Sequence, residues 1–182
     1  MPDERALLTY DDYRELPDDG RRYELHAGEL VVSPAPGTRH QRILGRLFRI
    51  LSAHVESHDL GEVFVSPFDC VLSPRFVYQP DILFVDGKRL RAVDERGLMG
   101  APALAVEIES KASRRMDEEE KPSAYARFGV PHYWLVKPDS NEILAHTLRG
   151  AAYRRPVRAA APATASLAPF PELAIDLAAL FR

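Results

Sequence analysis

Cysteine is nearly absent from this sequence: Cys70 is the only one among 182 residues, so no disulfide can form within the chain. A single cysteine suits a reducing compartment. Long apolar runs are also absent, because no segment approaches the ~18 consecutive apolar residues that a membrane-spanning helix needs. Residues 1–5 are charged and lead into no apolar signal core. We therefore expect a cytoplasmic protein without a membrane anchor.

Positive charge is not in excess either, since the net charge at pH 7 is −3. This balance argues against a broadly basic nucleic-acid-binding surface but allows a local basic patch. Hydrophobic residues make up 46% of the chain and charged residues 28%, which is typical of a folded globular protein. No phosphate-loop, dinucleotide-binding or zinc signature is present. Because no linker or repeat divides the chain, we expect one domain over residues 1–182.

The clearest secondary-structure signal is a helix over residues 38–58. Thr38-Arg-His-Gln41 matches a capping box, with a hydroxyl at the cap and a glutamine three residues later. The apolar side chains behind it recur at about 100° per residue and so share one helix face. A second helix is expected to end near Phe128, before Gly129. The acidic run Asp117–Glu120 is expected to be a solvated start of that helix.

Strands are predicted on both sides of these helices. A hairpin over residues 22–32 precedes the first helix. Further β-type runs cover residues 62–65, 69–72, 80–85, 103–109, 132–136, 142–147 and, as an edge strand, 153–157. The alanine- and proline-rich stretch 159–171 is expected to cross the surface as an extended tail, before a short helix from Asp176. This order of elements predicts an α/β fold in which helices flank a mixed β-sheet.

Acidic residues interrupt two of the most apolar predicted strands. Asp81 stands at a strand start, where it would either bond a nearby loop backbone or serve a site. Around Glu107, alternation places Ala105, Glu107 and Glu109 on one strand face. Two carboxylates on an inner strand lose hydration and repel each other, so they need a cation, a basic side chain or a raised pKa. On an edge strand, the same face would meet water.

If the strands of Asp81 and Glu107 are neighbours, the two carboxylates converge. Carboxylates from adjacent strands are a usual way to hold Mg²⁺ or Mn²⁺, which are hard ions that prefer oxygen ligands. The pair therefore predicts a divalent-cation site.

The first predicted helix adds further candidates. His40 lies in the middle of its apolar face and points toward the sheet, where it is either a core histidine or a partner of a metal ligand. Arg39, Arg42, Arg46 and Arg49 lie within an arc of roughly 80°. Such a stripe suits contacts with a nucleic-acid backbone, but it is also explained by a solvated face or by an acidic partner subunit.

A series of short motifs runs along the chain in a characteristic order. They are Tyr23-Glu-Leu25 with Gly28-Glu-Leu30, Arg39-His-Gln41, Gln79-Pro-Asp-Ile82, Val106-Glu-Ile108, Lys121 with Tyr125, and Gly129-Val-Pro-His-Tyr-Trp134. With these motifs, residues 8–150 resemble the PD-(D/E)XK restriction-endonuclease-like superfamily. The resemblance is closer to one branch of it, which consists of small bacterial proteins.

That resemblance implies an αβββαβ core, here with an extra N-terminal hairpin and C-terminal strands. It implies that Asp81 and Glu107 bind Mg²⁺ or Mn²⁺, with Glu24 as a third acidic group. A solvent-facing strand position is the alternative for Glu24. The implied activity is hydrolysis of phosphodiester bonds in DNA or RNA. A sequence-specific enzyme of this size is expected to form a homodimer in order to cut both strands.

The sequence departs from the superfamily pattern after Glu107, where Glu109 replaces the lysine expected two residues later. Lys111 would share that strand face if the strand continued so far. Lys121 would instead reach in from the next helix, one turn before Tyr125. The resemblance favours Lys121, with the following proline in the first helical turn.

Three hypotheses of function follow from these residues. The first is a metal-dependent nuclease. The second is a catalytically inactive module that binds nucleic acid or protein and keeps the nuclease fold, because a fold does not fix an activity. The third is a structural homo-oligomer in which the arginine stripe meets an acidic face.

Overall fold

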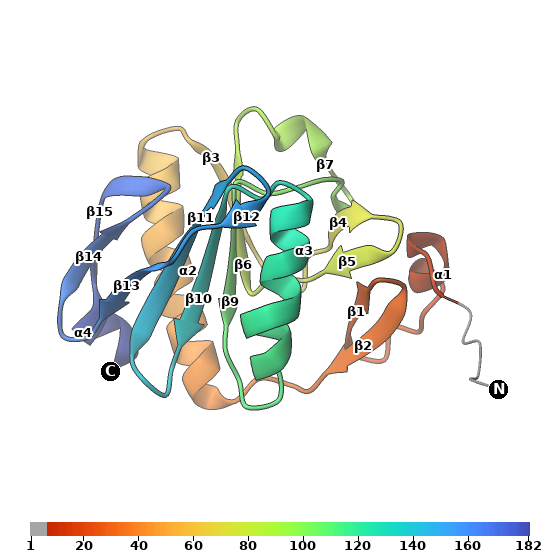
Figure 1. The fold of residues 1–182 in the computed structure, drawn as a ribbon, viewed down its shortest axis with the longest axis horizontal. Coiled ribbons are helices and arrows are strands. Elements are labelled where there is room, and N and C mark those ends of the chain that lie inside the picture. The colour runs from red at the N-terminus through yellow and green to blue at the C-terminus, as the bar shows by residue number, and fades with distance from the viewer. Residues whose placement is uncertain (1–6) are drawn as a thin grey trace.

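A seven-stranded mixed sheet forms the centre of the fold (Figure 1). The computed structural model describes residues 7–182, so the charged segment 1–5 lies outside the described residues. The strands of this sheet are β3 (Gly61–Val65), β6 (Ile82–Asp86), β9 (Leu104–Ile108), β10 (His132–Lys137), β11 (Glu142–Arg149), β12 (Ala152–Tyr153) and β13 (Val157–Ala160). Their order is β12-β11-β10-β9-β6-β3, and β13 also pairs with β11. Because β9 runs parallel to β10 and antiparallel to β6, the predicted mixed sheet is confirmed.

Two helices cover opposite faces of this sheet (Figure 1). These two are α2 (Thr38–Ser57) and α3 (Lys121–Arg127). The described residues also form the short helices α1 (Tyr10–Arg14) and α4 (Leu177–Phe181). On one face, Leu47 of α2 packs in a core cluster with Val106 of β9. On the other face, Tyr125 of α3 packs with Ala105 of β9 and with Tyr133. Successive residues of β9 therefore point to opposite layers, as strand alternation requires.

A second sheet carries the N-terminal hairpin. Its strands are β1 (Arg22–His26), β2 (Glu29–Ser33), β4 (Cys70–Ser73), β5 (Phe76–Tyr78), β7 (Val93–Asp94) and β8 (Gly97–Leu98), in the order β2-β1-β5-β4-β8-β7. The hairpin is confirmed, but the three-residue strand β5 was not predicted. Leu25 of β1 pairs with Val77 of β5, and the chain then runs through Gln79 and Pro80 to Asp81. This pairing brings β1 beside the start of β6.

The long helix α2 ends one residue before the predicted end, and its capping residue differs from the predicted one. Its five buried residues are Ile43, Leu44, Leu47, Leu51 and Val55, which recur at the spacing of one helix face. Gly37, not Thr38, is the capping residue. The predicted capping box at Thr38 is therefore wrong, because Thr38 already belongs to the first helical turn.

The expected surface tail over residues 159–171 is also wrong. This region contains the end of β13, β14 (Thr164–Leu167) and the start of β15 (Phe170–Asp176). Leu167 and Phe170 are each only 2% exposed, and the Nε1 atom of Trp134 donates a 2.7 Å hydrogen bond to the carbonyl oxygen of Ala168. The predicted short helix after Asp176 is confirmed as α4, which Asp176 caps. None of the helices in residues 7–182 is long and apolar enough to cross a membrane.

Candidate active site

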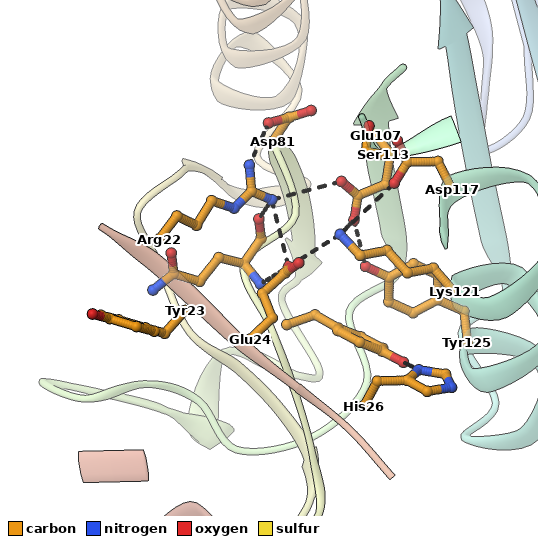
Figure 2. Close-up of polar contacts among 12 residues, drawn as sticks. Arg22, Tyr23, Glu24, His26, Asp81, Glu107, Ser113, Asp117, Lys121 and Tyr125 are labelled. Carbon is orange, nitrogen blue, oxygen red and sulfur yellow. Dashed lines mark hydrogen bonds and ion pairs between the residues drawn. The ribbon is translucent and has the colours of Figure 1, made fainter. Parts of the chain in front are cut away.

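A pocket of about 430 Å³ opens where the two sheets meet the start of α2 and the segment before α3. Most of its charged side chains come from elements far apart in the sequence, and Figure 2 shows several of them pointing toward one another. The charged or titratable residues that line it are Arg22, Glu24, His40, Asp81, Glu107, Arg115, Asp117, Glu120 and Lys121. Several of these groups are almost fully buried, so their charges must be balanced within the site.

Asp81 lies immediately before β6 and is only 2% exposed. Its Oδ2 atom accepts a 2.7 Å hydrogen bond from the backbone N–H of Ile108 and lies 3.1 Å from Nε2 of His40. Its Oδ1 atom accepts a 3.0 Å hydrogen bond from Arg22. Burial acts to raise the pKa of Asp81, but His40 and Arg22 together hold that pKa below its ordinary value. Asp81 therefore bonds a neighbouring backbone and also contributes an ionised carboxylate to the pocket.

Glu107 lies on β9, which is an inner strand between β6 and β10. The edge-strand interpretation of this residue is therefore wrong. Its Oε1 atom accepts hydrogen bonds from Nζ of Lys121 at 2.9 Å and from the hydroxyl of Tyr125 at 2.8 Å. Burial raises the pKa of Glu107 to about 8, although Lys121 acts in the opposite direction. The cost of burying this carboxylate is thus only partly offset by its neighbours.

Lys121 is the first residue of α3, and the following Pro122 occupies a position where no backbone donor is needed. Its Nζ atom lies 2.9 Å from Glu107 and 3.0 Å from Oε1 of Glu24. Burial alone would lower the pKa of Lys121, but Glu107 and Glu24 raise it above its ordinary value. The ammonium group therefore stays charged inside the site.

Glu24 faces the pocket from β1 and is only 2% exposed, so the solvent-facing interpretation of this residue is wrong. Besides contacting Lys121, its Oε1 atom accepts a 2.7 Å hydrogen bond from the backbone N–H of Gln79. The same carboxylate thus joins the hairpin to the loop before Asp81.

Asp117 was expected in a solvated run, but it is only 2% exposed. It lies in η2 (Met116–Glu120), a π-helical turn that leads directly into α3. Its Oδ1 atom lies 3.9 Å from Nζ of Lys121 and has no hydrogen-bond partner among residues 7–182. Burial raises the pKa of Asp117 to about 6. The four-residue spacing between Asp117 and Lys121 is the sequence signal that could have placed both on one helix face.

Arg22 is the second site residue that sequence reasoning missed. Its terminal nitrogens lie 3.0 Å from Asp81, 3.5 Å from Glu24 and 3.7 Å from Glu107. Figure 2 marks these three contacts with dashed lines. One of the terminal nitrogens also donates a hydrogen bond to the carbonyl oxygen of Gln79. The neighbouring carboxylates raise the pKa of Arg22 even though burial acts to lower it. Arg22 and Glu24 stand two residues apart on one strand, a spacing that predicts a shared face.

Glu109 and Lys111, the two candidate site residues that follow Glu107, do not line this pocket. Glu109 is 5% exposed and contacts Arg114 at 3.3 Å and Lys137 at 3.4 Å. Lys111 is exposed and lies outside the pocket. The strand ends at Ile108, so the alternation that would have carried both residues toward Glu107 does not continue.

The arginine stripe lies along α2, outside the pocket lining. Arg42 and Arg49 are exposed. Arg39 donates hydrogen bonds to the carbonyl oxygen of Pro138 at 3.0 Å and to Oδ1 of Asn141 at 2.8 Å. Arg46 donates one at 3.1 Å to the carbonyl oxygen of Leu180. Two of the four arginines thus tie α2 to other parts of the chain.

The pocket could hold a divalent cation if its own cations rearranged. Within residues 7–182, no group of three or more His, Cys, Asp or Glu side chains is arranged to hold a metal ion as it stands. The carboxylates are nevertheless hard oxygen donors, which suit Mg²⁺ and Mn²⁺. Asp117 also offers a buried oxygen without a hydrogen-bond partner among the described residues. The positively charged guanidinium of Arg22 already lies among three carboxylates, where a metal ion would lie. The donor set therefore fits a divalent ion that takes over part of the role of Arg22.

Comparison with known proteins agrees with this fold. The family model "Uma2: Putative restriction endonuclease" matches residues 10–178. Among solved structures, the chain is similar to a "putative nuclease belonging to DUF820" from Anabaena variabilis. The two have a TM-score of 0.80 and 19% sequence identity, and the match covers 96% of this chain and 97% of the other. At that identity, the likeness concerns the fold alone. No curated protein matches the chain.

Proposed function

The chain belongs to the Uma2 family of putative restriction endonucleases, and on that premise we propose that it is a divalent-metal-dependent nuclease. Its substrate would be DNA or RNA, and its reaction the hydrolysis of a phosphodiester bond. The observation that carries this proposal is the convergence of buried Asp81, Glu107 and Lys121 in one pocket. Such a group combines oxygen ligands for a cation with a fixed positive charge.

Asp81 and Glu107 would hold the ion, with Asp117 as a further oxygen donor. When bound, the ion supplies an acidified water and shields negative charge on the phosphate. Lys121 keeps its proton on Nζ and places a positive charge where charge develops on the phosphate oxygens. Glu24 and Glu107 hold that ammonium group in place. Lys121 would thus serve in the role that Glu109 cannot fill.

Two neighbouring groups would orient these ligands. His40 lies within hydrogen-bond distance of Oδ2 of Asp81, and the hydroxyl of Tyr125 donates to Oε1 of Glu107. Partners of this kind fix the direction of a carboxylate and are important for metal affinity. His40 and Tyr125 would therefore act as positioning residues.

Contacts with the nucleic-acid backbone would come from the arginine stripe on α2. Arg42 and Arg49 are exposed and suit phosphate oxygens. Arg39 and Arg46 would contribute at the cost of their present bonds to carbonyl oxygens. A homodimer would place two sites on the two strands of a duplex.

The experiment that tests this proposal is a cleavage assay on plasmid DNA, single-stranded DNA and RNA. The protein is first treated with a chelator and then supplied with Mg²⁺ or Mn²⁺. Cleavage that appears only after the metal is restored is the expected result. Metal-saturated protein that cuts none of the three substrates would contradict the proposal.

A second candidate is a binding module without catalysis. It is favoured by one observation: Arg22 and Lys121 already supply cations to the carboxylates of the pocket. Such a protein would bind nucleic acid or a protein partner equally well with metal and with chelator. A binding affinity that depends strongly on Mn²⁺ would contradict this candidate.

A further inference from the structure

The guanidinium of Arg22 stands where the proposed divalent cation would have to lie. One terminal nitrogen is 3.0 Å from Asp81, and the other is 3.5 Å from Glu24 and 3.7 Å from Glu107. Asp81 and Glu107, the two proposed metal ligands, thus share one arginine as their common counter-ion. A divalent cation bound between Asp81 and Glu107 would be repelled by this guanidinium and would compete with it for the same carboxylate oxygens.

The two basic side chains of the site differ in how firmly they are held. The side chain of Lys121 is 3% exposed and is bonded to two carboxylates at 3.0 Å or less. The side chain of Arg22 is 24% exposed, and two of its three carboxylate distances are 3.5 Å or longer. Its Nε atom has no hydrogen-bond partner among the described residues. Arg22 is therefore the less enclosed of the two cations, and its departure would break its ion pairs and its hydrogen bond to the carbonyl oxygen of Gln79.

Arg22 also has a place to go. It is the first residue of β1 and lines the pocket of about 430 Å³, so its long side chain borders open space. Arginine carries several rotatable bonds and keeps its charge in any environment found in proteins. A movement of the side chain into the pocket requires no change in the strand.

From this geometry we propose that Arg22 is an internal, displaceable counter-ion of the metal site. In the metal-free protein it holds Asp81, Glu24 and Glu107 together, and a divalent cation binds by displacing its guanidinium. Arg22 then sets the metal affinity by competition, since part of the binding free energy is spent on breaking its ion pairs. This inference rests on the proposed metal site, and it adds that the guanidinium of Arg22 competes with the metal ion for the carboxylates.

The test is a calorimetric titration of Mn²⁺ into wild-type protein, Arg22→Met and Arg115→Met. Methionine retains much of the aliphatic stem but removes the charge. Arg115 is a matched control, because it lines the same pocket but is paired with Glu120 at 3.1 Å and is 81% exposed. Arg22→Met should bind Mn²⁺ at least tenfold more tightly than the wild type, whereas Arg115→Met should stay within about twofold of it.

The three proteins are also melted with and without Mn²⁺. Without metal, Arg22→Met should melt at a lower temperature than the wild type, because its carboxylates lose their counter-ion. Mn²⁺ should then raise its melting temperature by more than it raises that of the wild type. If Arg22→Met does not fold, Arg22→Lys takes its place. Lysine keeps the positive charge, but its single terminal nitrogen cannot contact the carboxylates as the two terminal nitrogens of arginine do. The Mn²⁺ affinity of Arg22→Lys should also exceed that of the wild type.

The outcomes separate this inference from the function it rests on. Wild-type protein that binds Mn²⁺ as tightly as Arg22→Met, or more tightly, overturns the competition and leaves the metal site intact. Binding by Arg22→Met but not by the wild type supports the competition in its strongest form. If neither protein binds Mn²⁺, the proposed metal site falls and the competition falls with it.

Discussion

The Nζ atom of Lys121 lies 2.9 Å from Oε1 of Glu107, and both side chains are almost completely buried. The two residues come from α3 and β9, which are separated by a loop and a π-helical turn. A positive charge therefore reaches this carboxylate from a helix, although Glu109 stands two residues after Glu107, where the superfamily pattern has lysine. The contact between Lys121 and Glu107 therefore supports the proposal of a catalytic site, although the sequence after Glu107 lacks the expected lysine.

Replacement of Lys121 by methionine tests that role. Cleavage should fall by about a hundredfold or more, the size of effect seen when one group that stabilises the transition-state charge is removed. Lys111→Met is the matched control, because Lys111 is exposed and lies outside the pocket. Initial cleavage rates of both variants with Mn²⁺ decide between the two lysines. A loss confined to Lys111→Met would contradict the assignment.

His40 is predicted to support metal binding through Asp81. Removing a group that orients a metal ligand typically lowers metal affinity by about 10- to 100-fold. His40→Ala should show such a loss when Mn²⁺ binding is measured by calorimetry. His54→Ala is the control, since His54 lies on the same helix near its opposite end. Equal affinities in the two variants would show that His40 is only a core histidine.

The stability of the metal-free protein should depend on the charge of Glu107. Burial raises the pKa of this carboxyl from 4.5 to about 8, so between those values the folded chain holds a proton that the unfolded chain lacks. The stabilisation is complete below the lower value and is lost as the pH rises through the higher one. The slope contributed by one such group reaches about 1.4 kcal/mol per pH unit.

Urea unfolding with chelator, at several pH values across this window, measures that slope. Glu107→Gln cannot titrate and should show a flatter fall in the free energy of unfolding than the wild type. The control is Glu62→Gln, because Glu62 is an exposed residue on β3 of the same sheet. An unchanged slope in Glu107→Gln would show that Lys121 keeps the carboxylate ionised throughout.

The C-terminal strands are predicted to be part of the core and not an appendage. Phe170 is 2% exposed, and the centroid of its ring lies 5.0 Å from that of the Phe84 ring. Truncation of a buried aromatic residue costs about 3–5 kcal/mol, so Phe170→Ala should destabilise the protein by that order. Val157→Ala, at a position that is 62% exposed, should change stability by less than about 0.5 kcal/mol. Urea unfolding that gives equal values for the two variants would contradict this packing.

The layers of the fold could be predicted because their signals are local. The apolar face of α2 and the alternation in β9 both follow directly from residue spacing. The C-terminal region was misassigned because alanine and proline dominate its composition. The buried residues of the stretch 159–171 are Ala159, Leu167 and Phe170, and they are too few to give a clear hydrophobic period.

The site was only partly predictable for a different reason. Asp81 and Glu107 stand out because a carboxylate in an apolar strand needs a partner. Arg22 and Asp117 did not stand out, because their inward direction depends on tertiary contacts. Arg22 reaches Asp81 through the pairing of β1 with the short strand β5, and Asp117 turns inward within η2. Neither feature has a strong local signature.

Metal-dependent cleavage by wild-type protein and by Asp81→Asn tests the central claim most directly. Asparagine keeps the size of Asp81 but removes its negative charge, and thermal melting confirms that the variant is folded. Wild-type protein with Mn²⁺ should cleave nucleic acid, and Asp81→Asn should fall to the rate measured with chelator. Equal cleavage by the two proteins, or no cleavage by metal-saturated wild type, would contradict the assignment of a metal-dependent nuclease.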